Sequence, residues 1–158
     1  MFAGWLTAVL VLVVVFDVVT RYVFNFSIVA MQEGEWHVYS LIFLLGAGWA
    51  LKEDRHVRVD IFYTNQSPRV KAWINIIGTL IFLLPFSALA FFSSVPYFEA
   101  SLRTHEGSPD PGGLPGRWVL KGAILLGFLL LFLQGIAELI KAARFLAGKN
   151  PEYAEKVG

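Results

Sequence analysis

The chain has 158 residues, of which 56% are hydrophobic and only 16% are charged, and its formal net charge is +1. Soluble domains usually carry about 25% charged residues, so this composition is typical of a protein that lies in lipid. The near-neutral charge gives no indication of nucleic-acid binding. The sequence contains no cysteine, which excludes disulfides, thiolate nucleophiles and cysteine-based metal sites.

Four long apolar segments predict an all-α integral membrane protein with a single membrane domain over residues 1–158. A helix needs about 20 mostly apolar residues to cross the hydrocarbon core of a bilayer. The first segment has no positive n-region and no cleavage site, so we expect it to remain as a membrane anchor. The predicted spans are about 2–24, 30–51, 72–98 and 118–140, joined by an inner loop 52–71 and an outer loop 99–117.

Lysine and arginine are distributed unevenly between the two sides of these spans. Nine of them lie in the loop 52–71 or in the tail after the fourth span, whereas only four lie on the opposite side. Cytoplasmic segments retain such positive charges. The asymmetry therefore predicts that the loop 52–71 and both termini are cytoplasmic, an N-in, C-in arrangement of four helices.

Two prolines predict features of the third span. Ser67 before Pro68 is typical of a helix N-cap followed by proline at the first helical position, so we expect the helix to begin there, before it enters the membrane. Pro85 lies in mid-span, where it removes one backbone hydrogen bond and crowds the preceding turn. We expect it to kink the helix.

Asp17 and Arg21 are the least expected residues of the first span, because a charge at the centre of a membrane helix costs about 2.5–3.5 kcal/mol. They lie four residues apart with the acid first, which is the favourable order for an ion pair on one helix face. We interpret them as a pair that fixes helix packing. The alternative is a proton or ion relay, which ranks second because no third ionisable group is expected at the middle of the membrane.

A polar cluster lies at the outer start of the second span and contains Glu33, Glu35, Trp36 and His37. Carboxylates suit the positive end of a helix dipole, worth about 0.3–1 kcal/mol each. Glu33 and His37 share a helix face whereas Glu35 points elsewhere, so a metal site is not expected. We expect an outer-rim contact with another helix or protein.

The two longer loops differ in composition. The inner loop mixes dense charge with apolar residues, and we expect His56, Arg58 and Asp60 to meet water or protein. The outer loop contains the run GSPDPGGLPGR, which predicts a shaped, non-helical hairpin rather than a free linker. A phosphate-binding loop is rejected there, because no strand precedes the glycines.

In this order the motifs resemble the small membrane subunit of a tripartite ATP-independent periplasmic (TRAP) transporter, the DctQ-type component. The resemblance covers nearly the whole chain, and the charged loop after the second span is its most specific part. The matching pieces are Arg21-Tyr22-Val23-Phe24-Asn25, Glu35-Trp36, Gly46-Ala47, His56-Val57-Arg58-Val59-Asp60 and Gly112-Gly113-Leu114-Pro115.

The resemblance implies a non-catalytic scaffold without cofactor or metal in the bacterial inner membrane. Its partners would be a large TRAP permease subunit, which carries the solute and ion sites of the symport, a periplasmic solute-binding protein, and membrane lipid, but no nucleic acid. The competing hypotheses are an autonomous four-helix protein that forms an oligomeric channel, a membrane assembly factor, and a small membrane enzyme, for which clustered ionisable groups are lacking. The candidate partner interface comprises Glu33, Glu35, Trp36, His56, Arg58, Asp60, Gly112, Gly113, Leu114 and Pro115.

Overall fold

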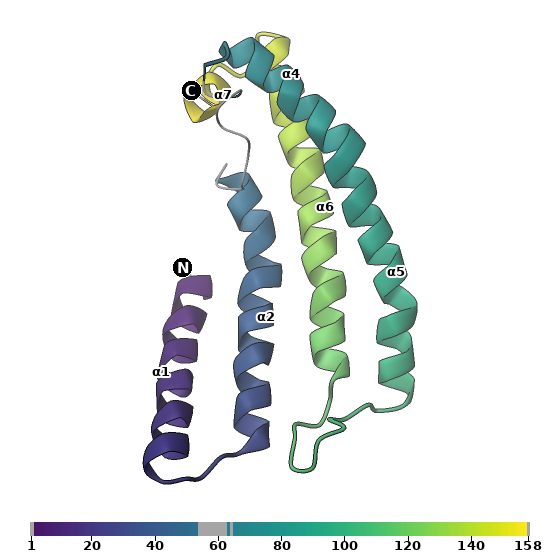
Figure 1. Ribbon diagram of the computed structural model, residues 1–158. Helices are drawn as coiled ribbons and strands as arrows, with labels where there is room; N and C mark the ends of the chain where they lie inside the picture. Colours follow the sequence, from purple (N-terminus) through teal and green to yellow (C-terminus); the bar gives the residue numbers. More distant parts are fainter. Residues whose placement is uncertain (1, 54–62, 64, 158) are drawn as a thin grey trace. The chain divides into compact units, whose positions relative to one another are not determined.

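A computed structural model describes residues 2–53, 63 and 65–157. Helices make up 80% of the structure, and the described residues contain no strand, so the predicted all-α class is confirmed. The helices are α1 (Phe2–Val23), α2 (Val29–Lys52), α4 (Pro68–Gly78), the π-helical turn η1 (Thr79–Leu83), α5 (Leu84–Arg103), α6 (Trp118–Leu146) and α7 (Glu152–Val157), as labelled in Figure 1.

Three stretches of the described chain are long and apolar enough to cross a membrane. They are Gly4–Val23, Pro68–Arg103 and Trp118–Leu146, and they correspond to the first, third and fourth predicted spans. Helix α2 has 24 residues but is not among them. Its first turns carry Glu33 and Glu35, and these carboxylates make it less apolar than the other three.

The chain divides into two compact units. The first unit comprises Met1–Gly46 and Phe92–Gly127, and the second comprises Ala47–Phe91 and Phe128–Gly158. The first unit therefore contains all of α1, most of α2, the end of α5, the outer loop and the start of α6. The second unit contains the remaining parts of these helices together with α4, η1 and α7.

One stripe of α1 is partly buried in the first unit, and the rest of this helix is exposed. The less exposed side chains recur every three or four residues, which is the spacing of one helix face. They are Leu6, Leu10, Val13, Asp17 and Thr20. The opposite face leaves apolar side chains such as Leu12 (71% exposed) and Phe16 (56% exposed) uncovered. A membrane or a partner subunit must cover this face.

Helices α2 and α6 approach closely in the first unit because of Gly127. A Cβ atom at this position would lie 3.0 Å from the Cβ of Leu44 and 3.1 Å from the carbonyl oxygen of Leu44. These distances are shorter than ordinary van der Waals contacts. The absence of a side chain thus sets how near the two backbones lie, which is how small residues act in membrane helix packing.

In the second unit, the disturbance expected at Pro85 takes the form of the π turn η1, which ends directly before Leu84 and Pro85. Proline has no N–H and its ring crowds the carbonyl four residues earlier. The N–H of Leu84 bonds to the carbonyl of Thr79, five residues back, and so widens this turn. Ser87 stabilises the same region, since its hydroxyl donates to the carbonyl of Leu83 at 2.7 Å.

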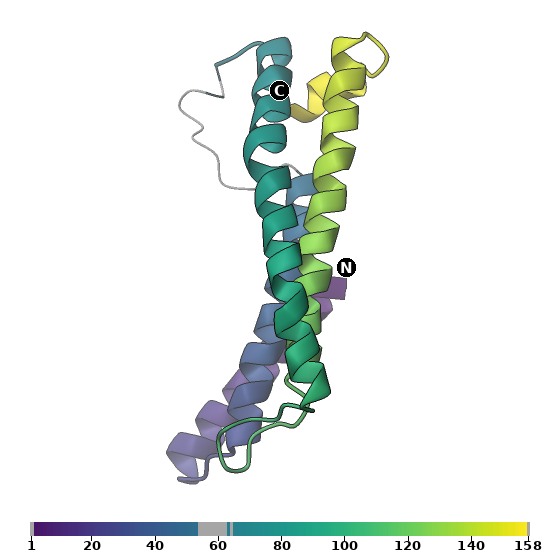
Figure 2. The same cartoon turned by 90° about the vertical axis from the view of Figure 1, so that its right-hand side faces the viewer.

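The second unit also contains a small core in which α7 packs against α4. Figure 2 shows α7 (yellow) beside the start of α4 (teal). Tyr153 of α7 is buried with Ala72 and Ala142. The side-chain amide of Asn75 donates to the hydroxyl oxygens of Tyr63 and Tyr153, at 3.0 Å each. Ser67 occupies the N-cap of α4, as predicted, but its side chain makes no capping hydrogen bond.

We predict that Gly127→Ala destabilises the protein. The added methyl group would meet Leu44 at 3.0 Å and force α2 and α6 apart. The expected loss is about 1–3 kcal/mol of unfolding free energy, as for other overpacked contacts. The measurement is the thermal unfolding midpoint of the purified chain in detergent. Gly46→Ala is the matched control, because a Cβ there meets nothing within 4 Å. Equal midpoints for the two variants would contradict the close approach.

Candidate functional site

The carboxylate of Glu33 ties the outer loop to α2 in the first unit. Glu33 is only 4% exposed. One of its oxygens accepts the hydroxyl of Ser108 at 2.5 Å, and the other accepts the backbone N–H of Leu114 at 2.6 Å. The guanidinium of Arg117 lies 3.7 Å from the carboxylate and supplies the compensating positive charge. All three partners belong to the segment 104–117, which we call the outer loop hairpin.

Backbone hydrogen bonds close the outer loop hairpin on itself. The N–H of Ser108 donates to the carbonyl of Leu114 at 3.0 Å, and the N–H of Arg117 donates to the carbonyl of Glu106 at 2.9 Å. The N–H of Gly113 donates to the carbonyl of Asp110 at 3.0 Å and forms the tip. The prediction of a shaped, non-helical hairpin is therefore confirmed.

Gly113 is required at the point where the hairpin meets α2. A Cβ atom there would lie 2.7 Å from a carboxylate oxygen of Glu33 and would overlap with the side chain of Ser108. The neighbouring Leu114 also approaches α2, since its Cδ1 would lie 4.0 Å from a Cβ built on Gly34. Gly112 has a φ of 79°, a left-handed conformation within the same turn, and Pro115 is exposed.

A second ion pair fixes the two ends of the hairpin. The ammonium of Lys121, in the first turn of α6, lies 2.5 Å from the carboxylate of Glu106 and 3.8 Å from the ring centre of Tyr97. The hydrogen bond from Lys121 is the main reason why the pKa of Glu106 lies below its ordinary value. Glu106 therefore stays ionised at neutral pH and keeps the pair intact.

Aromatic contacts extend this site along α2. The guanidinium of Arg117 lies 5.8 Å from the ring centre of Trp36, which is within the range of a cation–π contact. The rings of Trp36 and His37 lie 4.3 Å apart. The Nδ1 of His37 lies 2.6 Å from the carbonyl oxygen of Glu33, which accepts its hydrogen bond.

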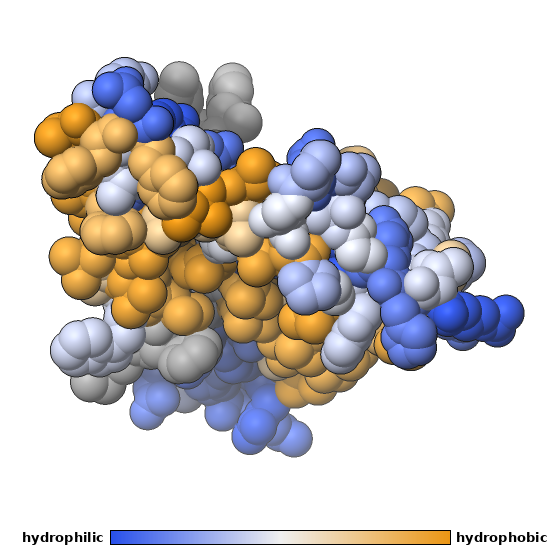
Figure 3. Space-filling model, turned by 90° about the horizontal axis from the view of Figure 1, so that it is seen from below, coloured by the Kyte–Doolittle hydropathy of each residue, from blue (hydrophilic) through white to orange (hydrophobic). Residues whose placement is uncertain are grey.

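Figure 3 looks at the molecule from below, at the end formed by this hairpin and by the link between α1 and α2. Pale and blue surface lies on the side of the hairpin, whereas orange surface lies on the side of α1 and the link. Exposed aromatic side chains of the α1 end include Tyr22, Phe24 and Phe26. Such residues suit a membrane–water interface. This end of the first unit thus combines a polar rim with an apolar edge.

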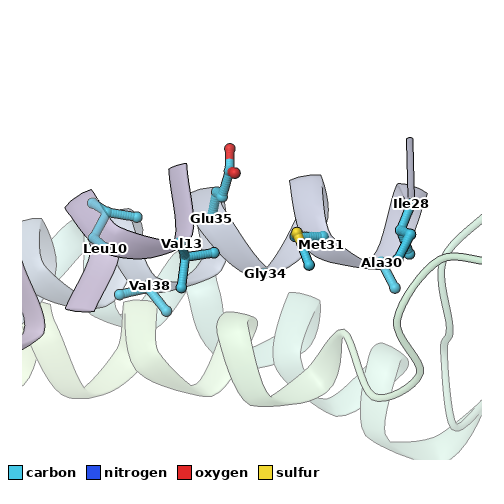
Figure 4. A pocket seen from close by; sticks show the side chains of 8 residues that line it. All are labelled: Leu10, Val13, Ile28, Ala30, Met31, Gly34, Glu35 and Val38. Atoms are coloured by element: carbon cyan, nitrogen blue, oxygen red, sulfur yellow. The ribbon is translucent and has the colours of Figure 1, made fainter. Parts of the chain in front are cut away.

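Glu35 lies on a different face of α2 from Glu33. It lines an apolar groove between α1 and α2, whose volume is about 360 Å³ (Figure 4). The groove is lined by Leu10, Val13, Ile28, Ala30, Met31, Gly34, Glu35 and Val38. On α1, the guanidinium of Arg21 forms an ion pair with the carboxylate of Asp17.

The structure brings some of the candidate interface residues together. Glu33, Trp36 and the glycine-rich run 112–115 meet at the outer loop hairpin, whereas Glu35 lines the groove between α1 and α2. His56, Arg58 and Asp60 lie outside the described residues. The sequence analysis missed Ser108, Glu106, Arg117 and Lys121, which complete the site. Arg117 and Lys121 lie close in the sequence to a loop that contains acidic residues, and this closeness could have identified them.

These features define a helical membrane protein. Its described polar groups, such as Glu33 and Arg117, mainly connect its helices to one another and to the outer loop hairpin. Residues 10–145 match a family model described as tripartite ATP-independent periplasmic transporters, DctQ component. The chain therefore belongs to the DctQ family, which consists of transporter components and not of enzymes. This match confirms the resemblance found in the sequence. A comparison with curated proteins gave no match.

We predict that Gly113→Ala weakens the contact between the hairpin and α2. The new methyl group displaces Ser108 and the Glu33 carboxylate, so Arg117 loses its ion-pair partner and the unfolding free energy falls by about 2–4 kcal/mol. Limited proteolysis at the hairpin and the thermal midpoint measure the effect. Gly107→Ala is the control, because its Cβ would lie 3.9 Å from the nearest atom. Unchanged protease resistance in Gly113→Ala would argue against the anchor.

Proposed function

We propose that this chain is the scaffold subunit of a TRAP transporter, which braces the large permease subunit and helps a periplasmic solute-binding protein to dock during ion-driven solute import. Membership of the DctQ family supports the transporter assignment. The observation that carries the docking role is the anchoring of the outer loop hairpin by Glu33. A loop held by a buried carboxylate offers a pre-organised surface, which costs less ordering entropy on binding.

The bracing role rests on the uncovered apolar faces of the helices. Side chains such as Leu12 on α1 and Phe82 in η1 are each more than two-thirds exposed. Within a bilayer, helices associate through close packing rather than through hydrophobicity. These faces are thus suited to lipid and to the helices of a large permease subunit. A four-helix oligomeric channel would need polar pore-lining groups, which the exposed faces of α1 and η1 do not provide.

The proposed arrangement in the bacterial inner membrane has four spans, with α2 as the second. At about 1.5 Å per residue, the 24 residues of α2 are long enough to cross the hydrocarbon core. Because Glu33 is compensated by the hairpin, its charge does not face lipid. The uneven lysine and arginine distribution supports cytoplasmic termini and a periplasmic hairpin. The ion pair of Asp17 and Arg21 would fix the packing of α1 on α2.

The topology is testable because the chain has no cysteine of its own. Single substitutions Asp110→Cys, Asn65→Cys and Lys149→Cys replace exposed residues. In spheroplasts, a membrane-impermeant maleimide should label the cysteine at 110 and should leave those at 65 and 149 unlabelled until the membrane is opened. Labelling of the cysteine at 149 in sealed spheroplasts would overturn the proposed topology.

Transport measurements test the scaffold role. In proteoliposomes with the large subunit and the binding protein, Glu33→Lys should reduce solute uptake about tenfold or more, because breaking a buried ion pair costs about 3–5 kcal/mol. Glu99→Lys is the control, since Glu99 is exposed and forms an ion pair with the exposed Arg103. Full-rate uptake by the large subunit alone, or saturable solute binding to this chain in calorimetry, would refute the scaffold role.

A further inference from the structure

A second apolar groove lies in the first unit, between α2 and α6. Its volume is about 250 Å³. The side chains of Tyr39 and Phe43 on its wall are 62% and 67% exposed, so the groove opens to the surface of the protein. The residues that line it are Tyr39, Ser40, Phe43 and Leu44 from α2 and Leu120 and Ile124 from α6.

The close approach of α2 and α6 at Gly127 closes one end of this groove. A Cβ atom on Gly127 would lie only 3.0 Å from the Cβ of Leu44, which is the last of the lining residues on α2. Ile124 precedes Gly127 by three residues, so the two lie on the same side of α6. The groove therefore extends from this contact toward the outer loop hairpin.

Trp36 and Arg117 lie one helical turn beyond the other end of the groove. Trp36 precedes Tyr39 by three residues on α2, and Arg117 precedes Leu120 by three residues. Residues with this spacing lie on one helix face. The carbonyl of Arg117 accepts the N–H of Lys121 at 3.2 Å, which extends the helical pattern of α6 to Arg117. The cation–π contact between Arg117 and Trp36 thus bounds the groove at this end.

The guanidinium of Arg117 keeps hydrogen-bond donors for a further acceptor. Its ion pair with Glu33, at 3.7 Å, is longer than a hydrogen bond. Its Nε is buried and has no acceptor among the described residues. The Glu33 carboxylate already accepts shorter hydrogen bonds from Ser108 and Leu114. Because the Arg117 side chain is 28% exposed, a ligand can reach its planar fork, which suits pairs of phosphate oxygens.

We propose that Arg117 and this groove form a binding site for one phospholipid of the surrounding membrane. The phosphate group accepts hydrogen bonds from the guanidinium, and one acyl chain lies in the groove between α2 and α6. The exposed side chains of Trp36 and Trp118 flank Arg117, and tryptophan is typical of the headgroup level of a membrane. The N-terminus of α6, directly after Arg117, adds a partial positive charge that favours an anion.

The site follows the order of groups in a phospholipid, because a cation with spare donors is followed by a continuous apolar groove. An acidic side chain of a partner protein could accept from Arg117, but it would leave the groove between Tyr39 and Ile124 unfilled. A zwitterionic headgroup suits the site best. Glu33 and Arg117 already balance each other in charge, and such a headgroup adds no net charge.

Native mass spectrometry of the full chain, released from detergent micelles, measures binding of palmitoyl-oleoyl phosphatidylethanolamine. Ser40→Phe fills the groove and should weaken the first binding step about tenfold. Arg117→Lys keeps the positive charge beside Glu33 but loses the planar fork, so it should weaken this step about fivefold or more. Ser40→Ala is the matched control, because it removes the same hydroxyl and leaves the groove open. It should bind the lipid as the wild type does.

Two further ligands separate the roles of the phosphate and the chain. A diacylglycerol with the same acyl chains lacks the phosphate, so the wild type should bind it about tenfold more weakly than the phospholipid. Millimolar inorganic phosphate lacks the chains and should not displace the bound phospholipid. Ser40→Phe does not touch the Glu33 anchor, so its hairpin should resist limited proteolysis as in the wild type, which shows that this variant is folded.

Four results would overturn the proposal. Equal affinity of the first phospholipid for the wild type, Ser40→Phe and Arg117→Lys would show bulk lipid only. Equal binding of diacylglycerol and phospholipid to the wild type would show that Arg117 does not hold the phosphate. Displacement by inorganic phosphate would identify an anion site without a lipid. Unchanged lipid affinity with lost assembly in both variants would assign the groove and Arg117 to the large permease subunit.

Discussion

The buried carboxylate of Glu33 is the interaction on which the first unit depends. A charge removed from water must be paired and hydrogen-bonded, or its burial is strongly unfavourable. Glu33 meets this requirement only while the hairpin is closed. The hydroxyl, the N–H and the guanidinium that contact the Glu33 carboxylate all come from the segment 104–117. The hairpin is therefore not a passive link between α5 and α6. Its conformation is fixed by the hydrogen bonds and the ion pair that it makes with Glu33.

Helix geometry gives α2 two polar faces with different roles. Successive residues are rotated by about 100°, so Glu33 and Glu35 point in nearly opposite directions. The carboxylate of Glu33 meets the hairpin, whereas Glu35 lines the groove between α1 and α2. This division explains why α2 is less apolar than the other long helices. The carboxylate of Glu33 faces the hairpin, and so it does not need to meet lipid.

The sequence predicted the helices well, because long apolar runs and proline positions are local signals. Ser67, Pro68 and Pro85 marked the start of α4 and the site of the π turn in this way. The partners of Glu33 were not predictable, since Ser108 and Leu114 lie 75 and 81 residues away. No local pattern encodes such a pairing. Gly127 was missed for a related reason, because its role depends on the position of Leu44 in another helix.

In the first unit, charged side chains and apolar side chains serve different purposes. In the first unit, Glu33, Glu106, Arg117 and Lys121 are used within the chain, so their charges specify its own loop. What remains uncovered on α1 is mainly apolar. Apolar surface gains little from leaving lipid, so a partner must recognise it by shape and close packing. A chain built in this way can hold the outer loop hairpin in one conformation and still present an apolar face on α1, because the two tasks use different residues.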